Sequence, residues 1–215
     1  ANTTAGFSVV TYTGTGANAT VGHGLGVAPS MVIVKRRDAV NSWAVWQTSI
    51  TGGQYLLLDS TAAVGTDTGI WNNTIPTSTV FSVGTASNIS NASGGTYVAY
   101  CFAPVAGYSA FGKYTGNGAD GPFVYTAMRP RFIMLKRTDS ATNWLVIDTT
   151  RNTYNGAGLT LKPNVSDAEI NDGSAYDILS NGIKLRNTFA GANASGGTYI
   201  YMAFAENPFK YANAR

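Results

Sequence analysis

The chain has 215 residues, of which 44% are hydrophobic and 12% are charged, and its formal net charge is +3. This length allows one large domain or two domains of about 100 residues each, and the content of apolar side chains excludes a disordered chain. The charged fraction is roughly half of the ~25% usual in globular domains. Such a surface suits a protein buried in an assembly or one that binds a neutral polar ligand such as a sugar.

Several kinds of partner and site are disfavoured by the same inventory. No basic run exceeds three residues, so we expect no nucleic-acid partner. No apolar stretch reaches about 18 residues, so we expect no membrane insertion. Cys101 is the single cysteine, which excludes a disulfide within one chain and a Cys-based zinc site, and we expect it to be buried. The chain opens without a secretory signal or an initiator Met, so we expect a fragment or a processed product.

Five phrases of the first half return in the same order in the second half, at an almost constant offset of about 100 residues, which indicates two copies of one unit. The phrase NASGGTY is identical at 91–97 and 193–199. The other four pairs are YTGTG (12–16) and YTGNG (114–118), PSMVIVKRRD (29–38) and PRFIMLKRTD (130–139), SWAVW (42–46) and NWLVI (143–147), and TYVAYCFA (96–103) and TYIYMAFA (198–205).

The duplication predicts two domains, residues 1–106 and residues 107–215. The junction APVAGYSAF is short and apolar, unlike the polar or Gly/Ser-rich sequence of a flexible linker. We therefore expect the two domains to pack together.

Each copy has the pattern of a β domain. SMVIVKR and RFIMLKR are short apolar runs of the kind that form strands. A Pro stands directly before each run, and the start of a strand tolerates the missing N–H of Pro. TYVAYCFA and TYIYMAFA are apolar on both alternating faces, so we expect a second sheet to cover one face and another copy or another chain to cover the other. Helix signals are confined to the capping-box spacing SDAE at 166–169. The sequence therefore predicts an all-β fold of two tandem, similar β-sandwich domains of jelly-roll type.

The repeated NASGGTY has two interpretations. Asn and Gly tolerate positive φ, so NASGG can form a tight turn that feeds the last core strand of each copy, and this structural interpretation is favoured. The alternative is a sugar-binding loop built from Asn and Ser.

Titratable residues form no pattern that predicts catalysis, so we expect no catalytic, cofactor-binding or metal-binding residues. His23 is the single histidine, in VGHGLG, and we interpret it as a turn residue. Asp38 and Asp139 follow Lys-Arg at equivalent places in the two copies, which favours a structural ion pair with a neighbouring Arg over the paired acids of a glycosidase. A group of acids in the second copy lacks the spacing of a calcium loop and is interpreted as a solvated acidic loop; it comprises Asp167, Glu169, Asp172 and Asp177.

Aromatic residues are the more informative group. Trp43 and Trp144 match between the copies, so we expect them to be core anchors. Trp71 in GIWNNT and Tyr154 in RNTYNGAG lie in predicted loops without counterparts in the other copy. An exposed ring flanked by Asn can stack on a sugar face while the amide bonds its hydroxyls, so we predict that Trp71 and Tyr154 contact a ligand. Ordinary loop packing is the alternative for both.

Three phrases, at residues 95–118, 121–139 and 197–210, carry a resemblance to a known family. They are GTYVAYCFAPVAGYSAFGKYTGNG, GPFVYTAMRPRFIMLKRTD and GTYIYMAFAENPFK. They resemble a domain of tailed-bacteriophage structural proteins, commonly found at the C-terminal end of tail-fibre-like proteins, and the resemblance covers nearly the whole chain. It carries no catalytic residues. Many proteins of this kind are homotrimers, which the doubly apolar final strands would suit.

The resemblance implies a non-enzymatic structural protein of a phage virion, as a tail fibre or receptor-binding tip. The implied partners are further copies of the chain in a homotrimer, other virion proteins and a host cell-surface glycan. Three alternatives stay open: a capsid decoration or fibre protein, a lectin-like carbohydrate-binding module, and a polysaccharide-degrading tail spike. The last is disfavoured because the chain offers few acids from which to build a hydrolase site.

Overall fold

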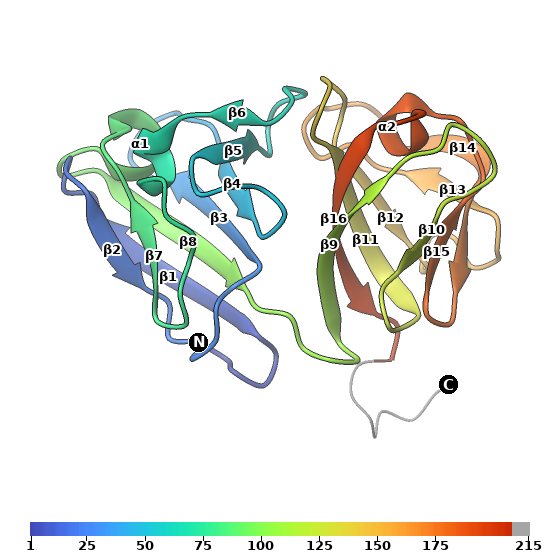
Figure 1. The fold of residues 1–215 in the computed structure, drawn as a ribbon, viewed down its shortest axis with the longest axis horizontal. Coiled ribbons are helices and arrows are strands. Elements are labelled where there is room, and N and C mark those ends of the chain that lie inside the picture. The colour runs from blue at the N-terminus through green and yellow to red at the C-terminus, as the bar shows by residue number, and fades with distance from the viewer. Residues whose placement is uncertain (208–215) are drawn as a thin grey trace. The chain divides into compact units, whose positions relative to one another are not determined.

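The computed structural model describes residues 1–207, apart from the side chains of Ser87 and Ser174, and confirms the all-β fold. The chain divides into two compact units, unit 1 (Ala1–Pro104) and unit 2, which starts at Val105. Each unit has its own hydrophobic core between antiparallel strands (Figure 1).

Unit 1 has a six-stranded sheet in the order β1-β8-β3-β4-β5-β6 and a two-stranded sheet, β2-β7. Its core lies between the two sheets, because Val21 of β2 and Phe81 of β7 cluster with Val32 and Val34 of β3. The strands are β1 (Phe7–Thr13), β2 (Ala19–Gly22), β3 (Met31–Arg36), β4 (Ala44–Gln47), β5 (Gln54–Leu57), β6 (Gly65–Thr66), β7 (Val80–Val83) and β8 (Thr96–Phe102). A single-turn helix, α1 (Thr68–Trp71), and a π-helical turn, η1 (Ser87–Asn91), complete the unit.

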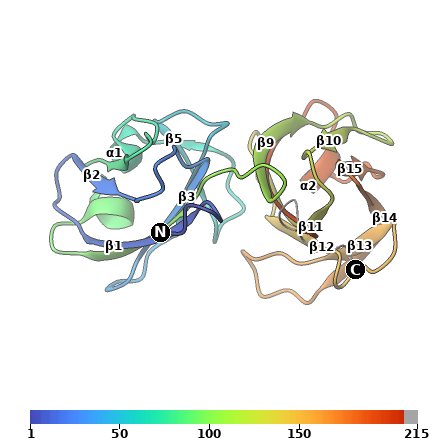
Figure 2. The ribbon, with the colours of Figure 1, turned by 90° about the horizontal axis from the view of Figure 1, so that it is seen from below.

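Unit 2 has two four-stranded sheets, in the orders β12-β11-β16-β9 and β10-β15-β14-β13, which lie on either side of its interior (Figure 2). Leu135 of one sheet and Ile183 of the other belong to the same core cluster. The elements are β9 (Ser109–Thr115), β10 (Phe123–Tyr125), β11 (Pro130–Arg137), β12 (Leu145–Asp148), β13 (Ala157–Thr160), β14 (Ile170–Leu179), β15 (Gly182–Leu185), α2 (Ala190–Asn193) and β16 (Thr198–Ala205). Of the helices in the described part of the chain, none has the length and apolarity to cross a membrane.

The two units share one framework and differ in one segment. The run β1-β8-β3-β4 in unit 1 matches β9-β16-β11-β12 in unit 2, and β2-β7 matches β10-β15. Between these shared strands, unit 1 adds β5 and β6 to its first sheet and then forms α1, whereas unit 2 sends β13 and β14 to its second sheet. We call residues 48–79 of unit 1 and 149–181 of unit 2 the divergent segments.

The predicted helical turn at 166–169 is wrong. Those residues form no helix and lead into β14. The carboxylate of Glu169 bonds the Arg151 guanidinium at 2.6 Å instead of reaching back to the backbone of Ser166. Because a capping box depends on that backward contact, the ion pair removes the reason for a helix.

The repeated NASGGTY is a structural element, and its first residue is a buried connector. In unit 1, Asn91 is 1% exposed, and its Oδ1 accepts a hydrogen bond from the N–H of Thr15 at 2.8 Å. Its Nδ2 donates to the carbonyl oxygens of Ala17 at 2.6 Å and Gly84 at 2.8 Å. One carboxamide therefore joins the chain before β2 to the chain after β7.

Unit 2 repeats this arrangement with Asn193, which is fully buried. Its Oδ1 accepts from the N–H of Asn117 at 2.8 Å. Its Nδ2 donates to the carbonyl oxygens of Ala119, Gly121 and Asn187, at 2.7, 2.5 and 2.6 Å. Since the amide is enclosed and its bonds are used within the protein, the structural interpretation of this phrase is confirmed, and its Asn is not available to a sugar.

The tyrosine that ends the phrase fixes the turn from the other side. In unit 1, the Tyr97 hydroxyl accepts from the N–H of Ala92 at 2.7 Å, and its ring stacks on Tyr12 with centroids 5.0 Å apart. In unit 2, Tyr199 stacks on Tyr114 at 4.9 Å. The final strand of each unit begins directly after this turn, at Thr96 and Thr198, as predicted.

The glycine of the repeated YTG phrase follows from the same turn. A Cβ at Gly14 would collide with the carbonyl oxygen of Ala92, and a Cβ at Gly116 would collide with that of Ala194. Both glycines also exchange backbone hydrogen bonds with the Gly-Gly pair of the repeated phrase, at 2.8 and 2.9 Å in each unit. The two repeated phrases are therefore halves of one backbone contact.

Replacement of Asn193 by Ala is expected to lower the free energy of unfolding of unit 2 by about 3–5 kcal/mol, because it leaves several buried backbone groups without partners. Urea unfolding followed through the NMR signals of β16 measures this change. The control is Asn18→Ala, which changes an exposed amide and is expected to stay within about 0.5 kcal/mol of wild type. Equal effects of the two substitutions would contradict the structural role of Asn193.

Candidate functional site

Among the residues that the structure describes, no three His, Cys, Asp or Glu side chains gather closely enough to hold a metal ion. His23 is buried, its Nδ1 accepts from the N–H of Leu25 at 3.2 Å, and its Nε2 therefore donates to the Thr77 carbonyl at 3.1 Å. Both ring nitrogens are therefore used within unit 1, and His23 is a buried residue of the loop after β2. Cys101 is buried in the core of unit 1 as expected, and burial raises the pKa of its thiol to about 12.

Asp38 and Asp139 form the predicted ion pairs at strand ends. Asp38 pairs with Arg36 at 3.0 Å, and Asp139 pairs with Arg137 at 2.9 Å. Each carboxylate also accepts from the first N–H of the final strand of its unit, at 3.1 Å from Thr96 and 2.9 Å from the equivalent residue of unit 2. The hydrogen bonds from the arginines, with those from the backbone, lower the pKa of both aspartates to about 2.

Lys136, which precedes this pair in unit 2, is fully buried. Its Nζ donates to the carbonyl oxygen of Thr142 at 2.7 Å, and the unit 1 counterpart Lys35 donates to the carbonyl of Asn41. Burial lowers the pKa of Lys136 to about 8. The lysines of the repeated Lys-Arg pairs therefore hold the loop that follows their strand.

The prediction of Trp71 as an exposed ligand-contacting ring is wrong. Trp71 is 2% exposed and packs in the core of unit 1, at the last position of α1. Asp67 caps this helix, with its Oδ1 accepting from the N–H of Gly69 at 2.8 Å, and so turns Ile70 and Trp71 inward. The core role expected of the matched tryptophans holds for Trp144, which is buried, whereas Trp43 is half-buried and stacks on Tyr100.

Tyr154 is exposed as predicted, at 86% of its surface. It lies in the divergent segment of unit 2, in the loop 149–156 between β12 and β13, which we call the Tyr154 loop. A ring this exposed makes few contacts with its own protein, so its position depends on how firmly the loop around it is held.

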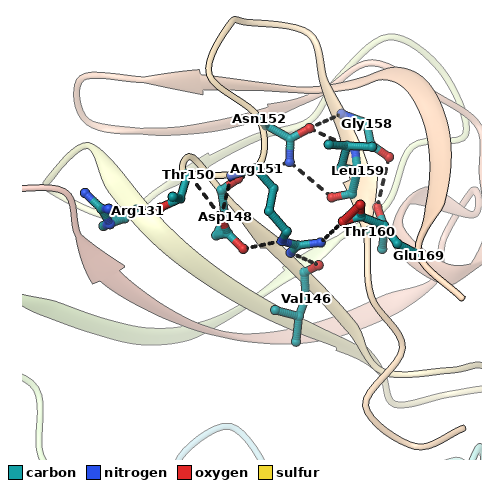
Figure 3. Close-up of polar contacts among 10 residues, drawn as sticks. All are labelled: Arg131, Val146, Asp148, Thr150, Arg151, Asn152, Gly158, Leu159, Thr160 and Glu169. Atoms are coloured by element: carbon teal, nitrogen blue, oxygen red, sulfur yellow. Dashed lines mark hydrogen bonds and ion pairs between the residues drawn. The ribbon is translucent and has the colours of Figure 1, made fainter. Parts of the chain in front are cut away.

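Asn152 closes the base of the Tyr154 loop (Figure 3). Its Oδ1 accepts from the N–H groups of Gly158 at 2.9 Å and Leu159 at 2.8 Å. Its Nδ2 donates to the carbonyl oxygens of Asp148 at 3.0 Å and Leu159 at 3.1 Å. All the bonding capacity of this amide therefore ties the two ends of the loop together.

Arg151 fixes the same loop by charge (Figure 3). Its guanidinium pairs with Asp148 at 2.5 Å and Glu169 at 2.6 Å and donates to the Val146 carbonyl at 3.3 Å. Burial opposes ionisation of Asp148, but the bonds from the backbone and side chain of Arg151 outweigh it and lower the pKa of the carboxyl. The guanidinium of Arg131 also contacts the loop, because it donates a hydrogen bond to the Thr150 hydroxyl at 2.9 Å.

The side-chain amides of Asn152 and Asn155, on either side of Tyr154, form hydrogen bonds within the protein, except for the Nδ2 of Asn155. The Oδ1 of Asn155 accepts from the N–H of Ile178 in β14 at 3.0 Å. Its Nδ2 has no partner among the described residues, so one amide donor stays available beside the ring. The site is thus one exposed phenol ring and one amide donor on a loop braced from both ends.

The residues that brace the loop were not recognised in the sequence. Arg151 and Asn152 carry no motif, and Glu169 was interpreted as part of a solvated acidic loop. Asp167 and Glu169 are exposed in the loop before β14, as that interpretation expects, and each also forms an ion pair, with Lys162 and Arg151 respectively. The interpretation is wrong for Asp172 and Asp177, which lie within β14, where Asp177 pairs with Arg186. The adjacent Arg151 and Asn152, shortly before the loop Tyr, were the available signal.

A protein-family model described as a domain of unknown function (DUF7483) matches residues 1–208, and so spans both units. Neither a curated protein nor a solved structure matches the chain.

Acidification is expected to weaken unit 2 through Asp139. The pKa of this carboxyl is about 2 in the folded unit and near 3.8 in the unfolded chain, so the stability that it contributes is complete above pH 4 and is lost as the pH falls through 2. The substitution Asp139→Asn should flatten the dependence of unfolding free energy on pH between 4 and 2, as measured by urea titration at a series of pH values. Identical slopes for variant and wild type would contradict this assignment.

Loss of the Asn152 amide is expected to loosen the Tyr154 loop without unfolding the unit. In Asn152→Ala, the amide protons of Gly158 and Leu159 lose their acceptor and should exchange with solvent about 10- to 100-fold faster. Hydrogen exchange read by NMR measures this. The matched control is Thr153→Ala, an exposed neighbour, and exchange rates that are equal in the two variants would show that Asn152 does not brace the loop.

Proposed function

We propose that the chain, which belongs to the family of a domain of unknown function (DUF7483), is a non-enzymatic structural protein of a tailed-phage particle. In that particle it contacts a host-surface glycan. In this proposal the chain is part of a tail fibre or receptor-binding tip, assembles as a homotrimer and is located in the virion. The virion part of the proposal rests on the resemblance of residues 95–118, 121–139 and 197–210 to tail-fibre-type domains.

The glycan part rests on a single observation, the exposed ring of Tyr154 on a loop that Asn152 and Arg151 hold in place. A Tyr ring offers a flat apolar face and a polar hydroxyl, and it loses little conformational entropy on binding because it has two rotatable bonds. A loop that is already held in place saves the cost of ordering it when a ligand binds.

The surface around the ring suits a neutral partner. The charge of Arg151 in the loop is paired with those of Asp148 and Glu169 beside it. The amide Nδ2 of Asn155 can donate to a hydroxyl or ether oxygen beside the ring. Stacking on a sugar face with one amide hydrogen bond is the contact that these groups allow.

Substitution of Tyr154 tests the proposal. The labelled chain is applied to an array of bacterial surface polysaccharides, and Tyr154→Ala should weaken the strongest signal at least tenfold, whereas Tyr154→Phe keeps the ring and most of the binding. Because the ring is exposed, Tyr154→Ala should leave stability within about 0.5 kcal/mol of wild type. The matched control is Tyr125→Ala, which removes another exposed ring of unit 2.

Three results would count against the proposal. One is a wild-type chain that binds no polysaccharide on the array. Another is equal binding by wild type and Tyr154→Ala, which would place the contact elsewhere. Release of reducing ends from any bound polysaccharide would favour a degrading tail spike over a non-enzymatic fibre. Sedimentation equilibrium separately tests the trimer, with three times the mass of one chain expected.

A further inference from the structure

Unit 1 has a polar hollow of about 390 Å³ beside α1, lined mostly by its divergent segment. Its lining consists of uncharged groups only, and no exposed aromatic ring is among them. The lining residues are Asn18, Thr68, Gly69, Asn72, Asn73 and Thr85. We call this hollow the asparagine pocket.

The walls of the asparagine pocket are fixed from below. Ile70 and Trp71 of α1 are buried in the core directly before Asn72. The carbonyl of Ile70 accepts from the Ser90 hydroxyl at 3.0 Å and from the N–H of Gly84 at 3.2 Å. The helix that precedes Asn72 and Asn73 is therefore tied to the framework of the unit.

Asn72 and Asn73 have left-handed backbones, with φ of 51° and 47°. The helix end holds them so, because the N–H of Asn73 donates to the Thr68 carbonyl at 3.1 Å and that of Thr74 donates to the Trp71 carbonyl at 3.1 Å. Gly53 lets Asn73 approach closely, since a Cβ there would lie 2.9 Å from the Asn73 Oδ1. Two consecutive amide side chains are thus presented from a rigid, uncommon backbone.

The side chains that line the asparagine pocket make no hydrogen bonds to other described residues. This holds for the amides of Asn18, Asn72 and Asn73 and for the hydroxyls of Thr68 and Thr85. It contrasts with Asn91, Asn152 and Asn193, whose amides are used within the fold. The pocket therefore gathers amides that the fold itself does not need.

From these features we infer that the asparagine pocket binds a neutral polyhydroxylated ligand of about the size of one sugar ring. An amide places an acceptor and two donors side by side, which matches neighbouring hydroxyl groups that both donate and accept. Absence of charge in the lining gives no counter-ion for a phosphate or an ammonium group. The volume lies within the range of small-molecule sites, roughly 300–1,000 Å³.

This site is independent of the proposed function, because it lies in unit 1 and needs neither Tyr154 nor a virion. The divergent segment of unit 2 forms β14 where unit 1 forms α1, so the described part of unit 2 lacks at that place the helix beside which the pocket lies. The experiment below therefore separates failure of the pocket from failure of the Tyr154 contact.

The test is an NMR titration of the ¹⁵N-labelled full chain with the methyl glycosides of glucose, galactose, mannose and N-acetylglucosamine. The side-chain NH₂ signals of Asn18, Asn72 and Asn73 are expected to shift saturably with at least one of them, with a dissociation constant on the order of millimolar. Two matched probes serve as controls: glycerol, which has hydroxyl groups but no ring, and inorganic phosphate, which carries charge. Neither should shift these signals saturably.

The double variant Asn18→Ala/Asn73→Gly removes two amides while glycine keeps the left-handed backbone at position 73. Its affinity for the glycoside should fall at least tenfold with an otherwise unchanged amide spectrum, while Tyr154→Ala should bind as wild type does. The inference is overturned if none of the glycosides shifts the three signals, if glycerol or phosphate saturates them equally, or if the folded double variant binds unchanged.

Discussion

Each unit of this protein is built around one buried carboxamide, that of Asn91 or Asn193. The side chain must accept from one backbone N–H and donate to carbonyl oxygens on separate segments. Among side chains of this length, only an asparagine combines these roles, since an aspartate would set negative oxygens against carbonyls. Because a buried polar group without a partner is costly, the surrounding glycines and tyrosine are constrained too. That constraint explains why the Asn, the two Gly and the Tyr of NASGGTY stand unchanged in both copies.

The two copies keep this framework and differ in the segment that leaves it. The divergent segment forms β5, β6 and α1 in unit 1, whereas it forms β13 and β14 in unit 2. The Tyr154 loop and four of the six residues that line the asparagine pocket lie on these segments. The pattern is that of a fixed scaffold with variable connections, in which the strands supply rigidity and the connections supply chemistry.

Sequence reasoning succeeded where a feature was both local and repeated. The strand-end ion pairs of Asp38 and Asp139 were predicted because their arginines lie two residues away in both copies. Trp71 was wrongly predicted to be exposed, because its burial depends on a one-turn helix that Asp67 caps. A helix of four residues is too short to be recognised from the sequence. The bracing role of Asn152 was missed because its partners come together only when β12 and β13 are in place. Burial and long-range pairing are properties of the assembled fold, so no local pattern reveals them.

The turn around Asn193 also bears on chemical ageing. An asparagine deamidates when the backbone nitrogen of the next residue attacks its side-chain carbonyl. Here that nitrogen belongs to Ala194, and its N–H is held by the Tyr199 hydroxyl at 2.8 Å, while the amide itself is enclosed. The equivalent nitrogen of Ala92 is held in the same way by Tyr97. The tyrosine of the repeated phrase therefore protects the buried amide of each unit, on which the framework depends, from deamidation. Such protection benefits any protein that must stay folded for a long time before it acts.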